Sequence, residues 1–436
     1  MAQIIIKCKS VKNGDIVQDK KRKLNIVIRV VLLIIFLGVA VFFITKGIVD
    51  LFSKKPGWSN IELEKITTKD GEELYPYYGD IKINYYFDED RQSMLTNNEV
   101  LEGIYNSSLG KTFMLLDTNN NYADVINLKY INEHPGEEII VEPFLYDTLK
   151  ELYQYSIDSS GVFNVFAGEL YSYWQDQILS GDPTFTDPIY DEVNKLKVEN
   201  IVSCSLSQLE KEDSLIFDDS KMSIIYNVSS ECSNSISLNT QFFSSIYAIN
   251  DLYDDLIEQN YIKGYIYTGE GNVKTLGNHP VSSTWDISLA DPNNIKTGAS
   301  NSFSNTYVLG NINVVTIGDY LSSGNYGIHK EDNDAIRYLY YDATTGYPIN
   351  NFRAIQIITS SNSFQDTLYN ALLMMNSPFD LTKQKISELS SSSTYILGVY
   401  NATLNVGYDD TKAIISKEVQ EYIYFTDSEI DVEIID

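Results

Sequence analysis

The chain has little histidine, cysteine or proline: its 436 residues include three His, three Cys and ten Pro. His134, His279 and His329 lie far apart in the sequence, and no Cys/His spacing is typical of a metal site. Basic residues are also scarce, because 32 Lys and Arg stand against 60 Asp and Glu, a formal net charge of −28. Nucleic acids bind basic surfaces, so this composition argues against a nucleic-acid partner.

One long uncharged run stands near the start of the chain. Residues 30–45 carry no charge, and the apolar character continues past Lys46 to Val49, which suffices to cross a bilayer if Lys46 reaches the interface. The first 29 residues contain eight Lys/Arg and two acids, whereas the remainder contains 24 basic and 58 acidic residues, a net charge of −34. By the positive-inside rule we expect a cytoplasmic tail over residues 1–29 and a transmembrane anchor over 30–49.

This topology makes the chain a single-pass protein of the cell membrane with its large domain outside the cytoplasm. The alternative is a cleaved signal peptide, but no small-x-small cleavage site follows the apolar run. A lipoprotein signal is excluded because the next cysteine after the run is Cys204. We therefore expect the apolar segment to be retained as an anchor.

The cysteines are expected to divide between two compartments. Cys8 would remain reduced in the cytoplasm, whereas Cys204 and Cys232 would face an exterior where disulfides form. Between them, residues 215–226 have a hairpin pattern with its tip at 218–221, which could bring both flanks within bridging distance. The sequence leaves open whether the two residues form a disulfide or remain small buried hydrophobes.

The part after the apolar run divides into a linker and a folded domain. Residues 50–75 are charged and polar and are expected to be a linker, and residues 76–436 are expected to form the extracytoplasmic domain. Ile81–Phe87 alternates like a strand, while Glu142–Tyr155 and Phe242–Gln259 have helical spacing. Residues 176–200 are expected to be a polar connection. Helices separated by groups of strands predict an α+β fold.

Three short motifs follow one another between residues 316 and 372. The clearest is Tyr341–Pro348, with the sequence YDATTGYP. Gly346 permits a left-handed backbone, Pro348 prevents continuation as a helix, and neighbouring Thr hydroxyls beside exposed amides suit an anionic ligand. Upstream lies TIGDY at residues 316–320, and downstream QDTLYNAL at residues 365–372.

The downstream motif places two oxygen ligands on one helix face. Asp366 and Asn370 are four residues apart in a segment of helical character. A carboxylate and an amide oxygen at this spacing suit a hard cation.

The order of these motifs resembles that of the FAD:protein FMN transferase family (ApbE-type), in which S-G-D-Y, H-I-x-D-P-x-T-G-Y-P and A-D-A-x-x-T-A elements succeed one another. Ser160–Gly168 is similar to the family's N-G-A-F-D-x-x-x-G, and Tyr267–Val273 to its N-x-G-G-N-I strand end. The resemblance covers residues 81–424, nearly the whole part outside the membrane. It implies an α+β, ApbE-like (T-fold-like) domain preceded by one N-terminal transmembrane helix.

The resemblance also implies a chemistry and a set of site residues. Family members cleave the FAD pyrophosphate with the help of a divalent ion, here Mg²⁺, and transfer FMN to a Ser or Thr hydroxyl of an acceptor protein. By position, Asp366 and Asn370 would hold the metal. The positions that match the family's flavin-binding elements are Gly271, Asn272, Gly318, Asp319, Tyr320, Asp342, Thr345, Gly346 and Tyr347.

The sequence departs from the family where its chemistry is expected. The family's I-D-L-G-G-I-A-K-G matches Ile236–Ser244, which reads ISLNTQFFS and has lost the glycines, the Asp and the Lys. The side chains of Asn239 and Thr240 would obstruct the approach of a phosphate to the backbone. Phe243 stands in place of the Lys and offers no positive charge.

Two further departures also remove groups that the family's chemistry would need. Leu339 replaces the His of the turn, which removes the expected proton-handling group, and Glu270 replaces the first Gly of G-G-N, which would repel a pyrophosphate. Two hypotheses follow. In the first, Asp366, Asn370 and Glu270 hold Mg²⁺ in an altered arrangement and the chain is an FMN transferase. In the second, it is an inactive family member that binds flavin, or only a partner, as a surface scaffold.

A third hypothesis makes the chain a flavoprotein substrate. Asn294–Ser300 reads NIKTGAS and is similar to the D-x-x-S/T-G-A-T/S sequence that accepts covalent FMN. Ser300 would then be the acceptor. The segment departs from the pattern at its first residue, which is Asn rather than Asp.

Overall fold

The computed structural model describes residues 28–46, 57–62, 66–67, 73–74, 81–179, 188–269, 271–290, 302–318, 330–332, 335–337, 340–348, 352–401 and 411–436. The chain divides into two units, residues 1–55 and 56–436. In the first unit, Ile28–Lys46 forms a helix of 19 residues that is long and apolar enough to cross a membrane. Most of the predicted basic tail lies outside the described residues.

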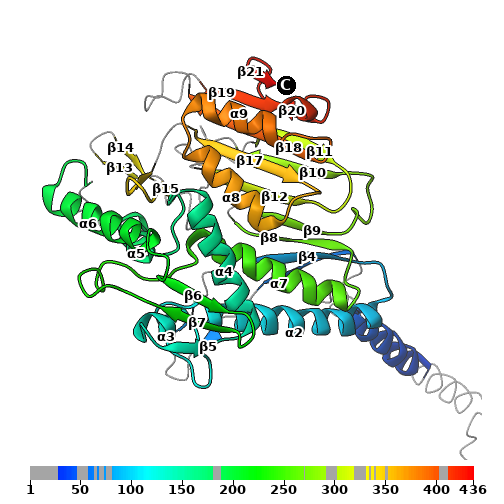
Figure 1. Cartoon of the computed structure of the whole chain (residues 1–436). Coiled ribbons are helices and arrows are strands. Elements are labelled where there is room, and N and C mark those ends of the chain that lie inside the picture. The colour runs from blue at the N-terminus through cyan, green and yellow to red at the C-terminus, as the bar shows by residue number, and fades with distance from the viewer. Residues whose placement is uncertain are drawn as a thin grey trace, which may run out of the picture. The chain divides into compact units, whose positions relative to one another are not determined.

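The second unit is built on a nine-stranded sheet, with the order β1-β4-β8-β9-β12-β17-β18-β19-β21 (Figure 1). Its strands are β1 (Gly57–Glu62), β4 (Lys82–Phe87), β8 (Gly264–Tyr267), β9 (Val273–Leu276), β12 (Asn313–Gly318), β17 (Ala354–Thr359), β18 (Thr394–Asn401), β19 (Thr411–Ser416) and β21 (Asp431–Ile435). Strand β4 has the alternating burial that its sequence predicts. Strand β1 falls within the range expected to be linker and pairs with β4.

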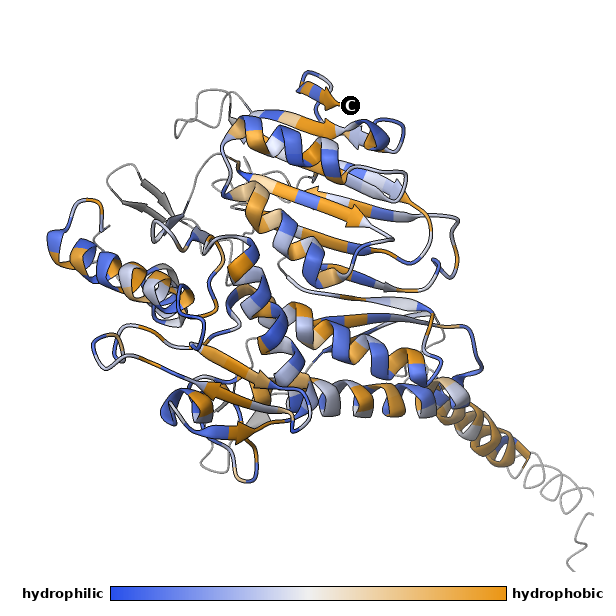
Figure 2. Ribbon diagram, viewed as in Figure 1, coloured by the Kyte–Doolittle hydropathy of each residue, from blue (hydrophilic) through white to orange (hydrophobic). Residues whose placement is uncertain are grey.

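Helices cover one face of this sheet (Figure 1). They are α2 (Arg91–Leu116), α7 (Ser244–Glu258), α8 (Phe364–Met375) and α9 (Phe379–Leu389). Val315, Ile317, Ile355 and Ile357 of the central strands join the main hydrophobic core on this side. Figure 2 shows the central strand β17 as a nearly continuous apolar run, as expected for a strand buried on both faces.

A small second sheet packs on the other face. It consists of β10 (Trp285–Ala290), β11 (Ser302–Val308) and β20 (Ile423–Phe425), with β11 in the middle. Trp285 and Ile287 pack against Val314 and Ile358 of the large sheet. The large sheet is therefore a central layer between helices and a narrower β-layer, an arrangement that agrees with the predicted α+β class.

A further group of helices and strands lies at one end of the sheet. The helices are α3 (Leu128–Glu133), α4 (Pro143–Asp158), α5 (Gly168–Leu179) and α6 (Glu192–Leu209), and the strands are β5 (Glu138–Ile140), β6 (Leu215–Asp218) and β7 (Ser223–Tyr226). Strands β6 and β7 form the hairpin that the sequence predicts. Cys204 and Cys232 are joined by a disulfide with their Cα atoms 5.5 Å apart, which answers the question that the sequence left open.

The expected connection over residues 176–200 is wrong in part. Helix α5 continues to Leu179, and α6 begins at Glu192. The carboxylate of Asp191 caps α6 by accepting a hydrogen bond from the Asn194 amide at 2.8 Å. The Asp and Pro residues around positions 182–191 suggested an irregular segment, whereas Asp191 is the start signal of a helix.

Candidate functional site

Of the residues that match the family's G-G-N and S-G-D-Y elements, the structure describes Gly271 and Asn272 in the β8–β9 hairpin and Gly318 at the end of β12. The amide of Gly271 donates to the carbonyl of Thr268 at 3.1 Å, and Gly271 has a positive φ of 85°. Asn272 is buried, and its Oδ1 accepts a hydrogen bond from the amide of Thr316 at 3.2 Å. The Thr316 hydroxyl donates to the Gly271 carbonyl at 3.1 Å. These contacts join the β8–β9 hairpin to β12.

Gly318 is required by backbone packing in the same region. It pairs with Ala354 across β12 and β17, and a Cβ atom at this position would lie 2.1 Å from the carbonyl oxygen of Arg353. The close approach of β17 thus explains the glycine at position 318 without reference to a ligand. Asp319, Tyr320 and Glu270 lie outside the described residues, so their predicted roles stay predictions.

The Tyr341–Pro348 motif forms the expected turn between β15 (Tyr341–Asp342) and β16 (Tyr347–Pro348). Asp342 is buried, and its Oδ1 accepts hydrogen bonds from the Thr344 amide at 2.8 Å and the Thr344 hydroxyl at 2.7 Å. The amides of Thr345 and Gly346 donate to the Asp342 carbonyl at 3.1 and 2.8 Å. The turn therefore uses the amides of residues 344–346 for its own structure.

Helices α5 and α6 pack against this turn. Gly346 has φ 81°, and a Cβ atom there would lie 2.5 Å from Val198 and 2.8 Å from Val202 of α6. The indole Nε1 of Trp174 in α5 donates to the Gly346 carbonyl at 2.8 Å. The side chain of Tyr347 is half-buried beside Trp174, with the ring centroids 6.1 Å apart.

The two predicted metal ligands are on the first turns of α8. The Asp366 side chain is exposed, and that of Asn370 is half-buried. Asp366 Oδ1 accepts from the Tyr155 hydroxyl at 2.7 Å, and Oδ2 accepts from the Ser363 hydroxyl at 2.7 Å. In the described part of the chain no group of three or more His, Cys, Asp and Glu side chains could hold a metal ion.

Tyr155 belongs to a group of five aromatic residues, hereafter the aromatic cluster: Tyr155, Phe163, Phe243, Tyr247 and Tyr369. The Tyr155 ring stacks on Tyr369 at 4.4 Å between centroids and lies 5.7 Å from Phe243. Phe243 is 0% exposed and meets Phe163 edge-on at 4.9 Å. The position at which the resemblance expects a Lys is thus occupied by a core side chain.

Carboxylates border the aromatic cluster. Glu151 accepts hydrogen bonds from the hydroxyls of Tyr155 at 3.2 Å and Tyr247 at 2.5 Å. Burial, reinforced by the neighbouring carboxylates, raises the pKa of both hydroxyls well above the ordinary value, so both remain donors. A cavity of about 450 Å³ between α4, α7 and the start of α8 is lined by Asp147, Glu151, Asp251 and Asp254, among others.

The segment that replaces the glycine-rich element is closed by its own side chains. Asn239, Thr240 and Gln241 are all buried, and Gln241 has φ 52°. The amide of Gln241 donates to Asn239 Oδ1 at 2.6 Å, and its side chain donates to the Asn164 carbonyl at 2.6 Å and accepts from the Tyr341 hydroxyl at 3.0 Å. A diphosphate does not fit here, because the space is filled and the Gln241 amide is already bonded.

The structure connects some of the predicted residues and leaves others apart. Phe242 packs on Tyr341 at 5.4 Å and Phe243 on Tyr155, so the turn motif and Asp366 are linked through the closed segment. Gly271 and Asn272 are instead bonded to Thr316 of β12, and Gly318 on the same strand pairs with Ala354 of β17.

Sequence reasoning missed Tyr155 and Glu151. Their spacing of four residues in the predicted helix at 142–155, facing Asp366 from α4, was the available signal.

Comparison with known proteins agrees with this architecture. The model of the ApbE family matches residues 114–386, more than half of the chain, and the chain belongs to this family. Among solved structures, it is similar to an ApbE protein from Thermotoga maritima, with 16% identity, TM-score 0.57, and coverage of 78% of this chain and 94% of that one. No curated protein matches the chain by sequence.

Two flavin transferases have a similar fold. The apo flavinyl transferase ApbE from Pseudomonas stutzeri has 16% identity and a TM-score of 0.57, with coverage of 85% of this chain and 98% of that one. The flavin transferase ApbE from Vibrio cholerae has 15% identity and a TM-score of 0.55, with coverage of 84% and 99%. At these identities the likeness concerns the fold. The predicted family and fold class are confirmed.

Proposed function

We propose that this chain is a membrane-anchored, extracytoplasmic ApbE-family protein that does not transfer FMN and serves as a binding or scaffold protein at the cell surface. One observation carries the proposal: Phe243, at the position where the resemblance expects a Lys, is completely buried in the aromatic cluster. A buried phenyl ring supplies neither charge nor hydrogen bonds to a phosphate.

The closed segment supports the same conclusion. Stabilisation of a diphosphate requires donors aimed at its oxygens in advance, and here the donors of Gln241 are bonded to Asn239 and Asn164. Opening the segment would leave buried polar groups unpaired, at about 1–3 kcal/mol for each group. The acidic lining of the cavity at α4 and α7 would further disfavour an anionic dinucleotide.

The cellular location rests on two features of the first unit. The helix Ile28–Lys46 has the length and composition of a membrane span, and the segment before it is basic. The positive-inside rule then assigns the basic end to the cytoplasm. The disulfide between Cys204 and Cys232 suits a domain exposed to an oxidising compartment.

A second candidate function is Mg²⁺-dependent transfer of FMN from FAD to a Ser or Thr of an acceptor protein. The exposure of Asp366 favours it, because one carboxylate remains at the surface with Asn370 one turn further along α8. Glu270 would complete the ligand set in this case. The Tyr155 and Ser363 hydroxyls already bonded to Asp366 count against it.

The full chain in detergent micelles, incubated with FAD, MgCl₂ and a peptide carrying the sequence Asp-x-x-Thr-Gly-Ala-Thr, distinguishes the two functions. We expect neither AMP release nor a peptide that gains the mass of FMN. Formation of the FMN-peptide by the native chain, with loss of the product in Asp366→Ala, would establish the transferase instead. The intact mass of the chain isolated from its source tests the remaining hypothesis, since flavinylation of Ser300 adds one FMN.

Flavin binding without turnover is a separate outcome of the same preparation. A rise in melting temperature with FAD would assign a flavin ligand to the scaffold, whereas an unchanged melting temperature leaves a protein partner as its function. Phe243→Leu is the matched control, because it keeps the position apolar and should leave the FAD response unaltered.

A further inference from the structure

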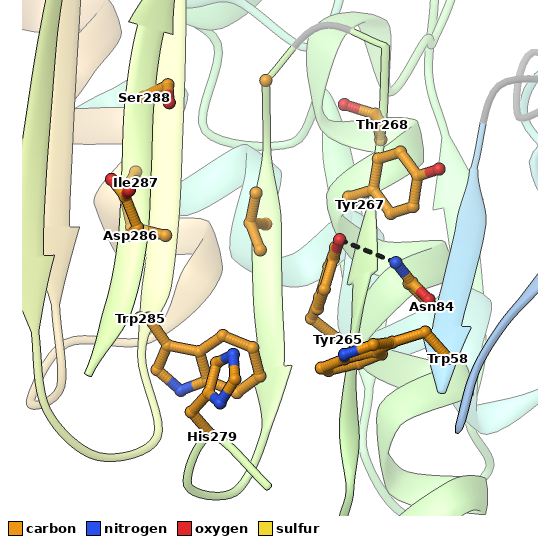
Figure 3. A pocket seen from close by; sticks show the side chains of 12 residues that line it. Trp58, Asn84, Tyr265, Tyr267, Thr268, His279, Trp285, Asp286, Ile287 and Ser288 are labelled. Carbon is orange, nitrogen blue, oxygen red and sulfur yellow. Dashed lines mark hydrogen bonds between the residues drawn. The ribbon is translucent and has the colours of Figure 1, made fainter. Parts of the chain in front are cut away.

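The small sheet stops short of the edge of the large sheet. Strand β10 has β11 as its strand partner, and its opposite edge has no strand partner within the described residues. Beyond that edge, the same face of the large sheet carries side chains of β8, β4 and β1 (Figure 3). Free strand edges are templates for pairing with another chain, so the β10 edge is a place to look for a partner.

The direction of the hydrogen bonds shows which β10 groups face outward. The Tyr307 amide donates to the Tyr422 carbonyl at 3.0 Å, so the odd-numbered residues of β11 bond toward β20. The even-numbered residues of β11 therefore bond toward β10, where Thr306 is opposite Ile287. It follows that Asp286 and Ser288 direct their N–H and C=O groups away from β11, toward the open edge.

A groove runs along this edge (Figure 3). It has a volume of about 460 Å³. Asp286, Ile287 and Ser288 form one wall, and Tyr265 and Tyr267 of β8 form the opposite one. Val273 of β9 also lines the groove.

Aromatic rings close one end of the groove. Trp58, Tyr265, His279 and Trp285 gather there, with 4.6 Å between the centroids of His279 and Trp285 and 6.0 Å between those of Trp58 and Tyr265. Asn84 fixes the Tyr265 ring by donating to its hydroxyl at 2.9 Å. Trp58 is 39% exposed, which leaves a large indole surface available for contact.

We propose that this groove binds an extended peptide segment of a partner protein, which adds to the β10 edge as a fourth strand of the small sheet. The outward groups of Asp286 and Ser288 would pair with the peptide backbone, and alternate peptide side chains would rest on Tyr265, Trp58 and Trp285. A fourth strand continues the small layer over the uncovered strands, which a compact small molecule does not do.

The charge around the groove selects the peptide further. The Asp286 side chain is exposed at the edge, and the chain as a whole has a net charge of −28. We therefore expect a peptide with apolar or aromatic residues at alternate positions and at least one Lys or Arg. The groove lies on the sheet face opposite to the helices that carry Asp366 and Phe243, so the inference is independent of whether FMN is transferred.

Selection from a phage-displayed library of random dodecapeptides tests this inference on the full chain in detergent micelles. Enriched peptides are then titrated against the native chain, Ser288→Pro, Ser288→Ala and Trp58→Ala. Ser288→Pro removes an outward N–H while leaving the backbone bonds to β11, whereas Ser288→Ala keeps that N–H. Both variants lose the hydrogen bond from the Ser288 hydroxyl to Asn305 of β11, so that loss cancels in the comparison. We expect Ser288→Pro and Trp58→Ala to weaken binding about tenfold or more, and Ser288→Ala to retain it.

A second comparison keeps the test decisive if Ser288→Pro does not fold. Methylation of alternate backbone nitrogens of an enriched peptide should abolish binding in one register and preserve it in the other. The proposal is overturned if no peptide is enriched, or if Ser288→Pro and the methylated peptides bind as well as their parents. A dimer of the native chain by light scattering that disappears in Ser288→Pro would also overturn it, by assigning the edge to a second copy.

Discussion

The hydroxyl of Tyr155 donates a hydrogen bond of 2.7 Å to Asp366, and the ring of the same residue faces Phe243 at 5.7 Å. One side chain of α4 thus contacts both the predicted metal ligand and the residue in place of the expected Lys. The Tyr155 hydroxyl is a hydrogen-bond partner of Asp366, and the Tyr155 ring is part of the hydrophobic surroundings of Phe243. Asp366 and Phe243, both located through family motifs, thus take part in the packing of α4.

Removal of the Tyr155 hydroxyl should destabilise the fold. In Tyr155→Phe, Asp366 and Glu151 each lose a donor, and we expect the free energy of unfolding to fall by about 1–2 kcal/mol. Urea denaturation measures the change, with Tyr424→Phe as a control because Tyr424 is largely exposed. A double-mutant cycle with Asp366→Asn should give a coupling energy of about 1 kcal/mol. A coupling near zero would show that the contact contributes nothing to stability.

Substitution of two glycines with similar positive φ angles should distinguish the cost of a side-chain clash from the cost of backbone strain. Gly346 has φ 81° and packs against α6, whereas Gly310 has φ 87° with nothing within 4 Å of the position of a Cβ atom. Gly310→Ala should cost about 1–2 kcal/mol from the backbone alone. Gly346→Ala should cost about 1–3 kcal/mol more, because Val198 and Val202 must move. Equal losses in urea denaturation would contradict the packing of α6 on the turn.

The disulfide should contribute strongly to stability. It closes a loop between residues that are 28 positions apart, for which chain entropy predicts about 3–4 kcal/mol. The Cys204→Ala/Cys232→Ala variant should lose this amount in urea denaturation. Dithiothreitol should produce the same loss in the native chain and leave the variant unchanged. A reductant effect on the variant would mean that another process is being measured.

Lys274 should make stability depend on pH in the alkaline range. Its ammonium group lies 4.2 Å from the Tyr253 ring centre, and burial lowers its pKa to about 8, opposed by nearby Asp254. Between that value and the ordinary 10.5 the unfolded chain binds a proton that the folded chain does not, so stability rises with pH. We expect a gain on the order of 2 kcal/mol between pH 8 and pH 10.

Lys274→Met provides the comparison, because it keeps an apolar chain of similar length without the titrating group. The difference in unfolding free energy between variant and native chain should shrink as pH rises from 8 to 10. The difference is the better measure, since buried tyrosines such as Tyr85, whose pKa burial raises to about 12, oppose the trend above pH 10. A constant difference would show that Lys274 is charged in both states.

Much of the fold was accessible from local pattern. The alternation of Ile81–Phe87 predicted β4, the helical spacing of residues 142–155 predicted most of α4, and the hairpin at 215–226 formed as expected. Such elements form because one face is buried. The spacing of the apolar residues and the turn residues at the ends show this directly in the sequence. The start of α6 was missed because Asp is common both at helix N-caps and in loops, so Asp191 by itself does not distinguish the two.

The sequence predicted individual residues of the candidate site but not their contacts. Motif order located Asp366 and Gly346, but their partners are distant in sequence: Tyr155 is 211 residues from Asp366, and Trp174 is 172 residues from Gly346. Such pairs are set by the packing of α4 and α5, which no local pattern encodes. The substitution of Phe for Lys at position 243 showed that a charge was lost, whereas the aromatic cluster that surrounds Phe243 required coordinates.

The closed segment makes single replacements toward the family pattern costly. Its backbone is held by the side chain of Gln241, which bonds to the Asn164 carbonyl and the Tyr341 hydroxyl, so replacement of Gln241 alone removes two buried hydrogen bonds. Reversion of Phe243 alone would bury an ammonium group among aromatic rings. Each single replacement toward the family pattern is therefore expected to lower the free energy of unfolding. Restoring the glycine-rich pattern over residues 236–244 would therefore require several replacements made together.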